Sequence, residues 1–565
     1  MKPSLAIFLG HDAAIAVTDP ANDRIIQIEL EKIIKEKHYQ PSLKNKERLN
    51  EFMHIIQEVI RLLKRDYDMD NDFKYILHKG FFFKESEPEL LRILGSAFLH
   101  EEMVDMGGTH HHKLHARSAY VQSPFRGDKA LALTYDGGGD TCFSGRFGFD
   151  KHRLNHEVLD MINIGWLFCN FTDFLPYSIT LKHSPGGGGR LARSIRIDTA
   201  GKLMGLSAYG KYSTEGYHTI KWYMDEVYPK LVFKEDGLEG NQWGGKLLIN
   251  HYRKRYGFPK SFPITMEDEC DIAWELQELA KIMVRQVFED FILPIAKNYN
   301  NNILISGGCG MNVIVNQMIR ELYPQLNIFV PSNPGDAGLA LGMLAEFFKR
   351  DLAPCKDPHL SNLRLMDLEN VPTLLEERGA TEIDIEDFSD LLDEGAIVGF
   401  IDGGIEVGAR SLCRRSIIAS ASYPGMKDKI NEKVKHREWF RPFAPVVRDR
   451  DVETYFESPS YYNLESMNYA LTTREPWREQ LSAVNHVDNT ARVQVLKKHE
   501  SPFIYQLLDR RSPYVLLNTS FNIGGKPILN TLEDALWILD NRDLDHVIIV
   551  HENKLMKIDK TALKV

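Results

Sequence analysis

A run of histidines near residue 111 is the first feature of the sequence whose spacing could do chemistry. His111 and His115 stand four residues apart, so on a helix they share one face and can bind one metal ion. Asp136 follows and could add a carboxylate oxygen. Imidazole nitrogen together with carboxylate oxygen suits a divalent transition metal such as Fe(II) or Zn(II), and an incomplete shell leaves positions for a substrate. The alternative is an exposed histidine run that binds nothing.

Three glycine-rich turns could bind phosphate groups. They are 136-DGGGD-140, 306-SGGCG-310 and 333-NPGDAG-338. Glycine lets backbone N–H groups approach phosphate oxygens, and helices expected after two of these turns add their positive ends. Three such turns at the ends of strands favour a nucleotide ligand, although single turn glycines are common. Asp336 begins a helix, where it is either a capping carboxylate or a further metal ligand.

Cations gather in two neighbouring segments, 410–417 and 433–445, of an otherwise acidic chain. Arginine forks and lysine ammonium groups suit a polyphosphate. A solvated basic face is the alternative, but the phenylalanines and prolines around the second segment favour a structured, partly buried pocket. Further along, 517-LNTSFNIGG-525 supplies hydroxyl and amide groups directly after a strand. The cations are Arg410, Arg414, Arg415, Lys433, Lys435, Arg437 and Arg441.

The elements that would position these residues alternate between strands and helices. Two similar strand–turn–strand openings, near residues 4 and 130, suggest a duplicated α/β domain whose halves face each other across a cleft, although two unrelated hairpins would look the same. The clearest helix spans 268–295, because its apolar residues recur with helical spacing and Pro294 is placed to end it. Strands are expected at 4–9, 13–18, 24–31, 130–135, 142–149, 302–305, 327–330, 396–401, 514–518 and 546–550, and further helices from 311 and over 337–349.

The composition excludes several classes of protein. At 565 residues, the chain needs more than one domain. Apolar residues make up 43% and charged residues 26%, which excludes a disordered or collagen-like chain. The net charge is 69 − 79 = −10, so bulk electrostatics give no reason to expect nucleic-acid binding. Cysteines without a CxxC pair, and the lack of an apolar run of about 18 residues, predict a cytoplasmic protein without a membrane span.

A series of sequence strings carries a resemblance that covers nearly the whole chain. The chain resembles the O-carbamoyltransferase family, which includes nodulation protein U, the cephem carbamoyltransferase and the tobramycin carbamoyltransferase. It departs from the family at Ala409, Cys413 and Lys526, and 29-ELEKII-34 replaces the family's early EERF string. The matching strings, in the family's order, are 10-GHDAA-14, 111-HHKLHARSA-119, 135-YDGGGD-140, 201-GKLMGLSAYGK-211, 307-GGCGMN-312, 333-NPGDAGLALG-342, 408-GARSLCRRSI-417, 426-MKDKIN-431, 435-KHREWFRPFAP-445, 486-HVDNTARVQ-494 and 517-LNTSFN-522.

The resemblance implies a two-domain α/β fold. Residues 1–350 would form a duplicated actin-like (ASKHA) domain, similar to the threonylcarbamoyl transferases of tRNA modification. Residues 351–390 would connect it to a YrdC-like α/β domain at 391–565. In the family, the YrdC-like domain forms carbamoyl adenylate from carbamoyl phosphate and ATP, which binds with Mg²⁺. The larger domain then transfers the carbamoyl group to a substrate hydroxyl beside a bound Fe(II) or another divalent transition metal.

The resemblance also assigns roles to individual residues. The metal ligands would be His111, His115, Asp136 and Asp336. The large domain would hold carbamoyl adenylate with Gly137, Gly138, Gly307, Gly308, Asn312 and Gly335. The YrdC-like domain would hold ATP and carbamoyl phosphate with Arg410, Arg415, Ser416, Lys435, Arg437, Arg441, Asn518, Ser520 and Asn522. The candidate catalytic residues are His11, Asp12 and Lys202, with His11 or Asp12 as the base unless these two only fix their turn.

The acceptor hydroxyl is the least determined part of the proposed reaction. It belongs to a small natural product or to a hydroxymethyl pyrimidine in a nucleotide or in DNA. Arg190, Arg193 and Arg196, in the glycine-rich segment 182–202, are candidate acceptor contacts. The segment 252-YRKRYGFPK-260 interleaves tyrosines with cations, as single-strand binders do. A solvated surface loop is the simpler explanation of either segment.

Three other functions stay open. A threonylcarbamoyl-type tRNA-modifying transferase would share the larger domain, but not the segments 408–445 and 517–522 in this order. An actin-like-fold kinase would transfer phosphate and would need no pair of histidines. A non-enzymatic nucleotide-binding module would bind ATP without releasing pyrophosphate. The family also suggests a homodimer.

Overall fold

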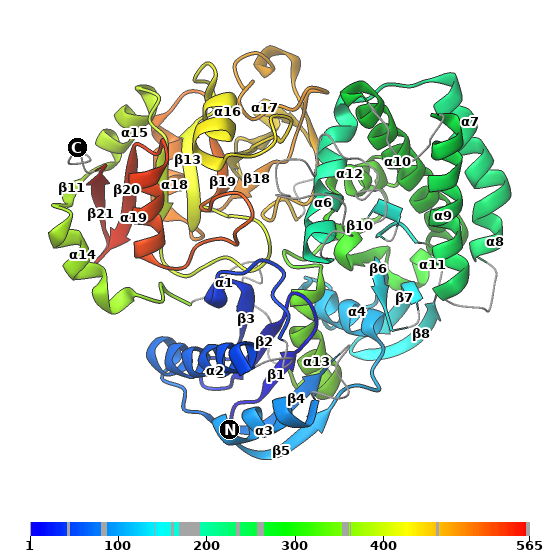
Figure 1. Cartoon of the computed structure of the whole chain (residues 1–565), viewed down its shortest axis with the longest axis horizontal. Coiled ribbons are helices and arrows are strands. Elements are labelled where there is room, and N and C mark those ends of the chain that lie inside the picture. Colours follow the sequence, from blue (N-terminus) through cyan, green and yellow to red (C-terminus); the bar gives the residue numbers. More distant parts are fainter. Residues whose placement is uncertain are drawn as a thin grey trace. The chain divides into compact units, whose positions relative to one another are not determined.

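The chain divides into two units, which the computed structural model describes separately (Figure 1). The first unit comprises Met1–Thr109, Pro331–Asn485 and Asn489–Val565, and the second comprises His110–Val330 and His486–Asp488. The predicted domain boundaries at residues 350 and 391 stay predictions. The described residues are 2–41, 46–80, 87–140, 142–159, 163–165, 167–168, 193–232, 238–256, 265–352, 361, 363–458 and 463–560.

The first unit opens with a five-stranded sheet in the order β3-β2-β1-β4-β5. Strands β1, β2 and β3 pair antiparallel, whereas β4 pairs parallel with β1 and β5 parallel with β4. Every residue of β1 is buried, as expected for a strand that is covered on both faces. The strands are β1 (Leu5–Phe8), β2 (Ala14–Asp19), β3 (Arg24–Glu29), β4 (Asp72–Lys79) and β5 (Leu99–Asp105).

The second unit contains a sheet that repeats this topology. Its order is β8-β7-β6-β9-β10, again with three antiparallel strands followed by two parallel ones. The predicted duplication of an α/β unit is therefore confirmed as a repeat of strand order and strand direction. The strands are β6 (Ala130–Gly139), β7 (Cys142–Asp150), β8 (Arg153–Leu159), β9 (Asn302–Ser306) and β10 (Asn327–Phe329), of which β8 was not predicted.

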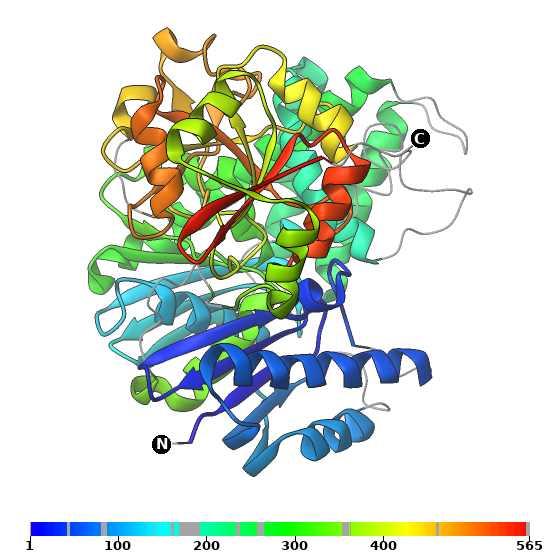
Figure 2. The ribbon, with the colours of Figure 1, turned by 90° about the vertical axis from the view of Figure 1, so that its left-hand side faces the viewer.

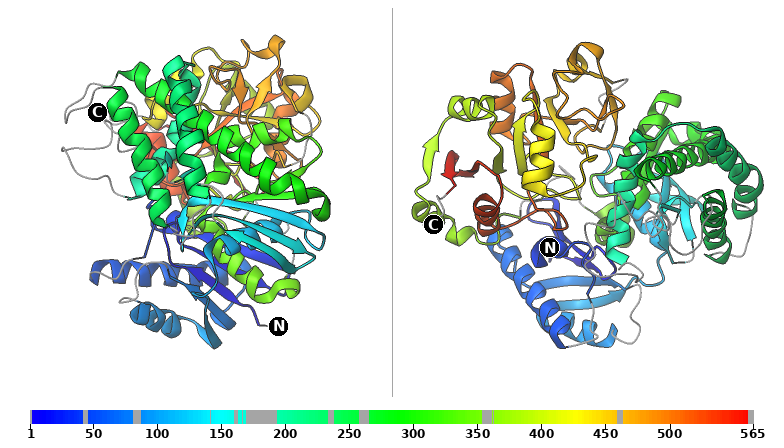
Figure 3. Two further views of the ribbon diagram at one scale, coloured as in Figure 1. Left: turned by 90° about the vertical axis from the view of Figure 1, so that its right-hand side faces the viewer. Right: turned by 45° about the horizontal axis from the view of Figure 1, so that its top comes forward.

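Helices pack on both of these sheets. In the first unit, α2 (Lys46–Tyr67) buries its apolar face against β1 and β2, and Figure 2 shows it running along the sheet. Helix α13 (Leu339–Phe348) contacts the same two strands. In the second unit, α4 (His111–Gln122) packs on β6 and β9. Figure 3 shows the helices of residues 193–296, in green, gathered beside the second sheet.

Two predicted element boundaries are wrong. The strand predicted over 24–31 ends at Glu29, where the short helix α1 (Leu30–Ile34) begins. Helix α10 (Met266–Val287) starts with a capping box between Thr265 and Asp268, but Pro294 does not end the helical run. A π-helical turn leads into α11 (Leu293–Ala296), and Pro294 lies in the first turn of α11, where its missing N–H leaves no hydrogen bond unmade.

The C-terminal part of the first unit is built on an eight-stranded sheet. Its order is β11-β21-β20-β12-β13-β19-β14-β18, and its core combines strand residues with α15 (Ile385–Asp393) and α18 (Pro502–Arg510). The predicted strands at 396–401, 514–518 and 546–550 correspond to β12, β19 and β20. The strands are β11 (Thr381–Ile383), β12 (Val398–Ile401), β13 (Arg415–Ser420), β14 (Ala444–Arg448), β18 (Gln494–Leu496), β19 (Val515–Ser520), β20 (His546–His551) and β21 (Lys554–Asp559).

The other elements are short strands and further helices. The strands β15 (Phe456–Glu457), β16 (Leu471–Thr473) and β17 (Thr490–Ala491) form a small sheet. No helix among the described residues is long and apolar enough to span a lipid bilayer. The helices are α3 (Glu87–Ala97), α6 (Arg193–Leu206), α7 (Thr214–Trp222), α8 (Tyr228–Val232), α9 (Leu238–Arg255), α12 (Val313–Leu322), α14 (Val371–Glu377), α15 (Ile385–Asp393), α16 (Met426–Lys429), α17 (Val452–Tyr455), α18 (Pro502–Arg510) and α19 (Leu532–Asn541).

Candidate metal and phosphate sites

Helix α4 carries the two histidines that the sequence places four residues apart. The side chain of His110 caps the helix by accepting a hydrogen bond from the backbone N–H of His112, and the backbone N–H of His111 donates to Asp140 Oδ2 at 2.6 Å. An acidic side chain at a helix N-terminus complements the helix dipole. His111 and His115 therefore project one turn apart from a well-anchored helix end, and both are buried.

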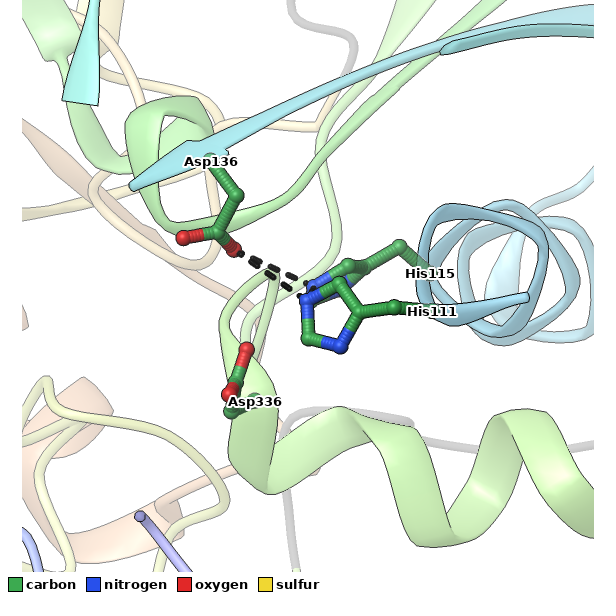
Figure 4. A group of neighbouring side chains, drawn as sticks. All are labelled: His111, His115, Asp136 and Asp336. Atoms are coloured by element: carbon green, nitrogen blue, oxygen red, sulfur yellow. Dashed lines mark hydrogen bonds and ion pairs between the residues drawn. The ribbon is translucent and has the colours of Figure 1, made fainter. Parts of the chain in front are cut away.

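The two imidazoles meet the carboxylate of Asp136 in β6, as Figure 4 shows. His115 Nε2 lies 3.0 Å from His111 Nε2 and 3.1 Å from Asp136 Oδ2, and His111 Nε2 lies 4.0 Å from the same oxygen. Burial alone would raise the pKa of Asp136, but the two histidines hold it well below its usual value. Two ring nitrogens and a carboxylate oxygen converge in a buried position, which is a donor set for a borderline transition metal. We call these three residues the metal triad.

Backbone N–H groups of predicted glycines fix the Asp136 carboxylate. Gly137 donates to Oδ1 at 2.5 Å, and Gly308 donates to Oδ2 at 2.8 Å. Gly139 lies against the ring of His111, because a Cβ on Gly139 would stand 2.1 Å from a ring carbon. The glycine-rich turns therefore orient the metal triad in this structure, and their predicted contacts with phosphate stay predictions.

The turn after β9 keeps its backbone close to β6. Gly307 has a φ of 89°, and a Cβ there would lie 2.2 Å from the carbonyl oxygen of Tyr135, so only glycine fits. Gly138 also has a positive φ, of 140°. Asn312 is the N-cap of α12, and its Oδ1 accepts a hydrogen bond from the backbone N–H of Val315 at 3.2 Å. The contacts predicted between these residues and carbamoyl adenylate stay predictions.

In the first unit, Asp336 lies in the turn that leads into α13 (Figure 4), directly after Gly335, and is buried. Its Oδ2 lies 3.0 Å from His11 Nε2, and His11 Nδ1 lies 2.9 Å from Asp12 Oδ2. Burial alone would raise the pKa of Asp12, but His38 and His11 hold it well below its usual value. Of the two predicted bases, Asp12 is therefore the weaker, and His11 stands between two carboxylates.

Four arginines form what we call the arginine cluster: Arg410, Arg437, Arg441 and Arg492. Burial and the neighbouring Arg441 lower the pKa of Arg410 to about 10. Burial lowers the pKa of Arg492 well below its usual value, and the other three arginines lower it further. Burial also lowers the pKa of Arg437 well below its usual value, Arg441 lowers it further, and Glu438 opposes the shift. Like charges gathered in a partly buried place favour the binding of an anion with several charges.

Lys435 and Arg415 were also predicted to contact phosphates, but their donors are engaged within the protein. Lys435 Nζ donates to Ser520 Oγ at 3.2 Å and to the carbonyl oxygen of Asn522 at 3.0 Å. The Arg415 guanidinium donates to the carbonyl oxygen of Asp402 at 3.0 Å. Both side chains are buried and brace strand ends of the C-terminal sheet. Their contacts with a ligand stay predictions.

The predicted residues Asn518 and Ser416 belong to one buried network. Asn518 Nδ2 donates to Gln494 Oε1 at 2.6 Å and to the carbonyl oxygen of Ser411 at 3.0 Å. Ser416 Oγ lies 2.5 Å from Ser411 Oγ and accepts from the backbone N–H of Cys413 at 3.0 Å. Cys413, where the chain departs from the family, has a φ of 69°, so the network holds a strained turn between β12 and β13.

The sequence analysis missed Arg492. This residue stands in 486-HVDNTARVQ-494, a string that was used for the family resemblance without singling out its arginine. The structure brings it to the arginine cluster because β18 pairs parallel with β14, with Gln494 opposite Val446. A cation two residues before one strand thus meets cations that precede another strand.

The predicted acceptor contacts fall in α6 or before it. Arg190 lies outside the described residues. Arg193 and Arg196 are in the first turns of α6, where the structure describes the backbone and not these side chains. Lys202 is farther along the same helix and is buried. No contact with an acceptor follows from these positions, and the roles of these four residues stay predictions.

For the segment 252–260 the sequence left two interpretations open, a surface for stacking nucleic-acid bases and a solvated loop, and two of its described residues, Tyr252 and Arg255, fit neither fully. Tyr252 is only 1% exposed, and its hydroxyl donates to Glu275 Oε2 at 2.6 Å. Arg255 forms an ion pair with Glu275 at 2.8 Å. Tyr252 and Arg255 therefore hold α9 against α10 instead of offering a stacking face.

Comparisons with known proteins agree with the sequence resemblance. The family model "Carbamoyltransferase N-terminus" matches residues 67–344, and "Carbamoyltransferase C-terminus" matches residues 389–557. Nodulation protein NolO of Bradyrhizobium diazoefficiens is 29% identical over 78% of this chain and 77% of its own length. The 3'-hydroxymethylcephem-O-carbamoyltransferase of Amycolatopsis lactamdurans is 28% identical over 63% of this chain and 64% of its own length. The alignment with the structure of MreB 5 of Spiroplasma citri bound to AMPPNP covers 62% of this chain and 96% of the MreB chain, at 12% identity and a TM-score of 0.29.

The two matched segments contain both candidate sites. The N-terminal match includes the metal triad and Asp336, and the C-terminal match includes all four residues of the arginine cluster. The predicted resemblance is confirmed. The chain belongs to the carbamoyltransferase family, a family of transferase enzymes.

Proposed function

We propose that the chain is an O-carbamoyltransferase that works in two steps. The first step makes carbamoyl adenylate from carbamoyl phosphate and ATP, and the second transfers the carbamoyl group to a substrate hydroxyl. The first step consumes one water: hydrolysis of carbamoyl phosphate would release orthophosphate and leave carbamate, whose oxygen would attack the α-phosphorus of ATP and displace pyrophosphate. AMP would leave in the second step, when the acceptor oxygen bonds to the carbamoyl carbon. The observation that carries the proposal is the arginine cluster: burial, and after it neighbouring arginines, lower the pKa of Arg410, Arg437 and Arg492, and cations in such a setting favour a polyanion.

The arginine cluster would do the work of the first step, in a C-terminal domain of YrdC-like type. Its guanidinium groups would bind the phosphates of ATP, carried with Mg²⁺, and of carbamoyl phosphate. Negative charge grows on pyrophosphate as it leaves, and fixed cations stabilise that charge without having to reorganise. Lys435 and Asn518 would keep the surrounding strand ends in place.

The metal triad would do the work of the second step, in a duplicated actin-like domain. His111, His115 and Asp136 offer a donor set that fits Fe(II) or another divalent transition metal. The sequence resemblance and the burial of its carboxylate support Asp336 as a fourth ligand. A metal bound there would act as a Lewis acid on the carbamoyl carbonyl and on the acceptor hydroxyl.

His11 would hold the Asp336 carboxylate in place for the metal. Its Nε2 lies 3.0 Å from Asp336 Oδ2, and its Nδ1 lies 2.9 Å from Asp12 Oδ2. A ring nitrogen that donates to a carboxylate has no lone pair for the hydroxyl proton, so the predicted role of His11 as the base would require Nε2 to leave Asp336 first. Asp12 would serve as the carboxylate that orients the ring.

The acceptor would be a hydroxyl of a small molecule. The Amycolatopsis lactamdurans relative is named for a hydroxymethylcephem. A nucleic-acid acceptor has less support, because Tyr252 and Arg255 are engaged with Glu275.

The experiment that tests this function measures pyrophosphate release from ATP with and without carbamoyl phosphate, on protein purified without oxygen and supplied with Fe(II). We expect release only when carbamoyl phosphate is present. Release of ADP, or no release of pyrophosphate, would contradict a carbamoyl-adenylate mechanism and favour an actin-like-fold kinase. Hydroxymethylcephems and hydroxymethylated nucleotides are then screened as acceptors.

A further inference from the structure

Asp12 is held by two histidines that come from different loops of the first unit. Its Oδ2 lies 2.9 Å from His11 Nδ1, in the turn between β1 and β2. Its Oδ1 lies 2.7 Å from His38 Nδ1, in the loop that follows α1. Because each carboxylate oxygen is engaged by a different ring, the plane and the direction of the carboxylate are fixed. His38 is not among the residues that the sequence analysis assigned to the reaction.

Asp12 and His38 both have an uncommon backbone conformation. Asp12 and His38 each have a φ of 56°, in the left-handed region that residues other than glycine rarely adopt. The two loops fix one another, because the backbone N–H of Ala13 donates to the carbonyl oxygen of Tyr39 at 3.0 Å. Strained residues of this kind persist where their surroundings determine them, and they concentrate at functional sites.

A second carboxylate completes the arrangement around His38. Glu31 Oε2 accepts the backbone N–H of His38 at 2.9 Å. Burial alone would lower the pKa of His38, but the nearby Asp12 carboxylate reverses this and raises it, with a smaller contribution from Glu31 and an opposing one from Lys37. The side chains of His38 and Asp12 are 15% and 19% exposed, so water screens their interaction only weakly.

We infer that His38 is a positioning residue for carbamoyl transfer: through Asp12, it fixes the ring of His11 so that Nε2 faces Asp336. The inference rests on the proposed function of Asp336 as a metal ligand, whose Oδ2 lies 3.0 Å from His11 Nε2. Without His38, only one oxygen of Asp12 would be held and the carboxylate could rotate, and the contact with His38 prevents this rotation. A His11 ring whose Nδ1 side is held in this way presents its Nε2 side to Asp336 in one direction and so orients that carboxylate.

The test compares His38→Ala with His38→Asn. The side-chain amide of asparagine stands near the position of Nδ1 and donates an N–H, and asparagine tolerates a positive φ better than most residues. His38→Asn therefore keeps the hydrogen bond to Asp12, and His38→Ala removes it. His38→Gln, whose amide lies one bond farther out, takes the place of His38→Ala if that variant does not fold.

The kinetic readout is the single-turnover formation of AMP from preformed carbamoyl adenylate, with water as the acceptor. We expect His38→Ala to slow this step about 10–100-fold, as loss of an orienting partner commonly does, and His38→Asn to recover most of the rate. Pyrophosphate release from ATP and carbamoyl phosphate stays unchanged in both variants. An unchanged rate in His38→Ala, or equal losses in both variants, would overturn the inference.

A crystal structure of each variant gives a readout that does not depend on activity. We expect the contact between His11 Nδ1 and Asp12 Oδ2 to persist in His38→Asn and to be lost in His38→Ala. A His11 ring that stays in place in His38→Ala would overturn the positioning role. If the unsubstituted protein released no pyrophosphate, the proposed function would fail, while this comparison of His11 would still decide the role of His38.

Discussion

The metal triad and the arginine cluster solve opposite electrostatic problems. In the triad, the imidazoles of His111 and His115 face the carboxylate of Asp136, so groups that attract one another hold the site together and lower the pKa of the carboxylate. In the cluster, burial lowers the pKa of Arg410 and Arg492, and neighbouring arginines lower it further. The triad therefore combines groups that attract one another, whereas the cluster gathers charges of one sign, with Glu438 paired to Arg441 at 3.6 Å.

This difference indicates which molecule each site depends on. A preorganised donor set keeps a resident ion through many turnovers. A cluster of cations that repel one another binds an arriving polyanion strongly. It releases a product more slowly when that product carries more negative charge. We therefore expect the metal to behave as a cofactor and the phosphates to behave as substrates and products. Substitutions and ligands that act on only one of the two sites test this difference between cofactor and substrate.

The largest effect is expected from Arg492→Ala. Removing one fixed donor to a developing negative charge commonly costs about 10²–10³-fold in rate, so pyrophosphate release should fall by that factor. Arg450→Ala is the matched control, because Arg450 is exposed and pairs with Asp509 away from the cluster. A rate within error of the unsubstituted protein in Arg492→Ala would remove this residue from the phosphate site.

The next effect is expected from Asp136→Asn, which keeps the shape of the side chain and removes its charge. Affinity for Fe(II) should fall about 10–100-fold, and pyrophosphate release should not change. Metal content after dialysis, measured by mass spectrometry, checks the first expectation. Asp128→Asn, at an exposed position of the same unit that bonds Asn300, is the control. Loss of Fe(II) affinity together with loss of pyrophosphate release in Asp136→Asn would mean that the two sites are not separable.

A smaller effect is expected from Gly139→Ala. The added Cβ would stand 2.1 Å from the ring of His111, so the ring must move or the backbone must shift. Overpacking of this kind costs about 1–3 kcal/mol, which chemical denaturation measures. Gly137→Ala is the matched control, because a Cβ at Gly137 meets nothing within 4 Å. Equal stability of the two variants would show that the triad is not tightly packed.

The smallest effect is expected when inorganic pyrophosphate is added to the protein without other substrates. A ligand at ten times its dissociation constant stabilises the folded state by about 1.4 kcal/mol, which is a shift of about one to two degrees in Tm for a chain of this length. The shift should appear in thermal melts of the unsubstituted protein and be absent in Arg492→Ala. A shift of the same size in both proteins would place pyrophosphate elsewhere.

The elements that follow local rules were predictable from the sequence. His111 and His115 were predicted to share a face because a helix has a fixed period, and the structure has them one turn apart in α4. The repeated strand–turn–strand openings likewise predicted two similar sheets. The anchoring of Asp136 by Gly137 and Gly308 was not predictable, because it depends on how the turn after β9 meets β6.

The errors and omissions arise where tertiary packing decides. Arg492 carries no local signal, and it reaches the arginine cluster only through the parallel pairing of β18 with β14. Tyr252 and Arg255 matched a pattern of alternating aromatic and basic residues, but both side chains are engaged by Glu275 of α10. His38 was overlooked because its partner, Asp12, lies on another loop. In each case, the decisive neighbour is distant in the sequence.

The central claim is that one chain contains two separable sites, one for making carbamoyl adenylate and one for using it. The most direct test is a single turnover of metal-stripped protein with ATP and carbamoyl phosphate, in which pyrophosphate and AMP are both measured. We predict pyrophosphate release at an unchanged rate without AMP, followed by AMP formation once Fe(II) is restored. Simultaneous loss of both products in the stripped protein, or formation of ADP, would contradict the claim.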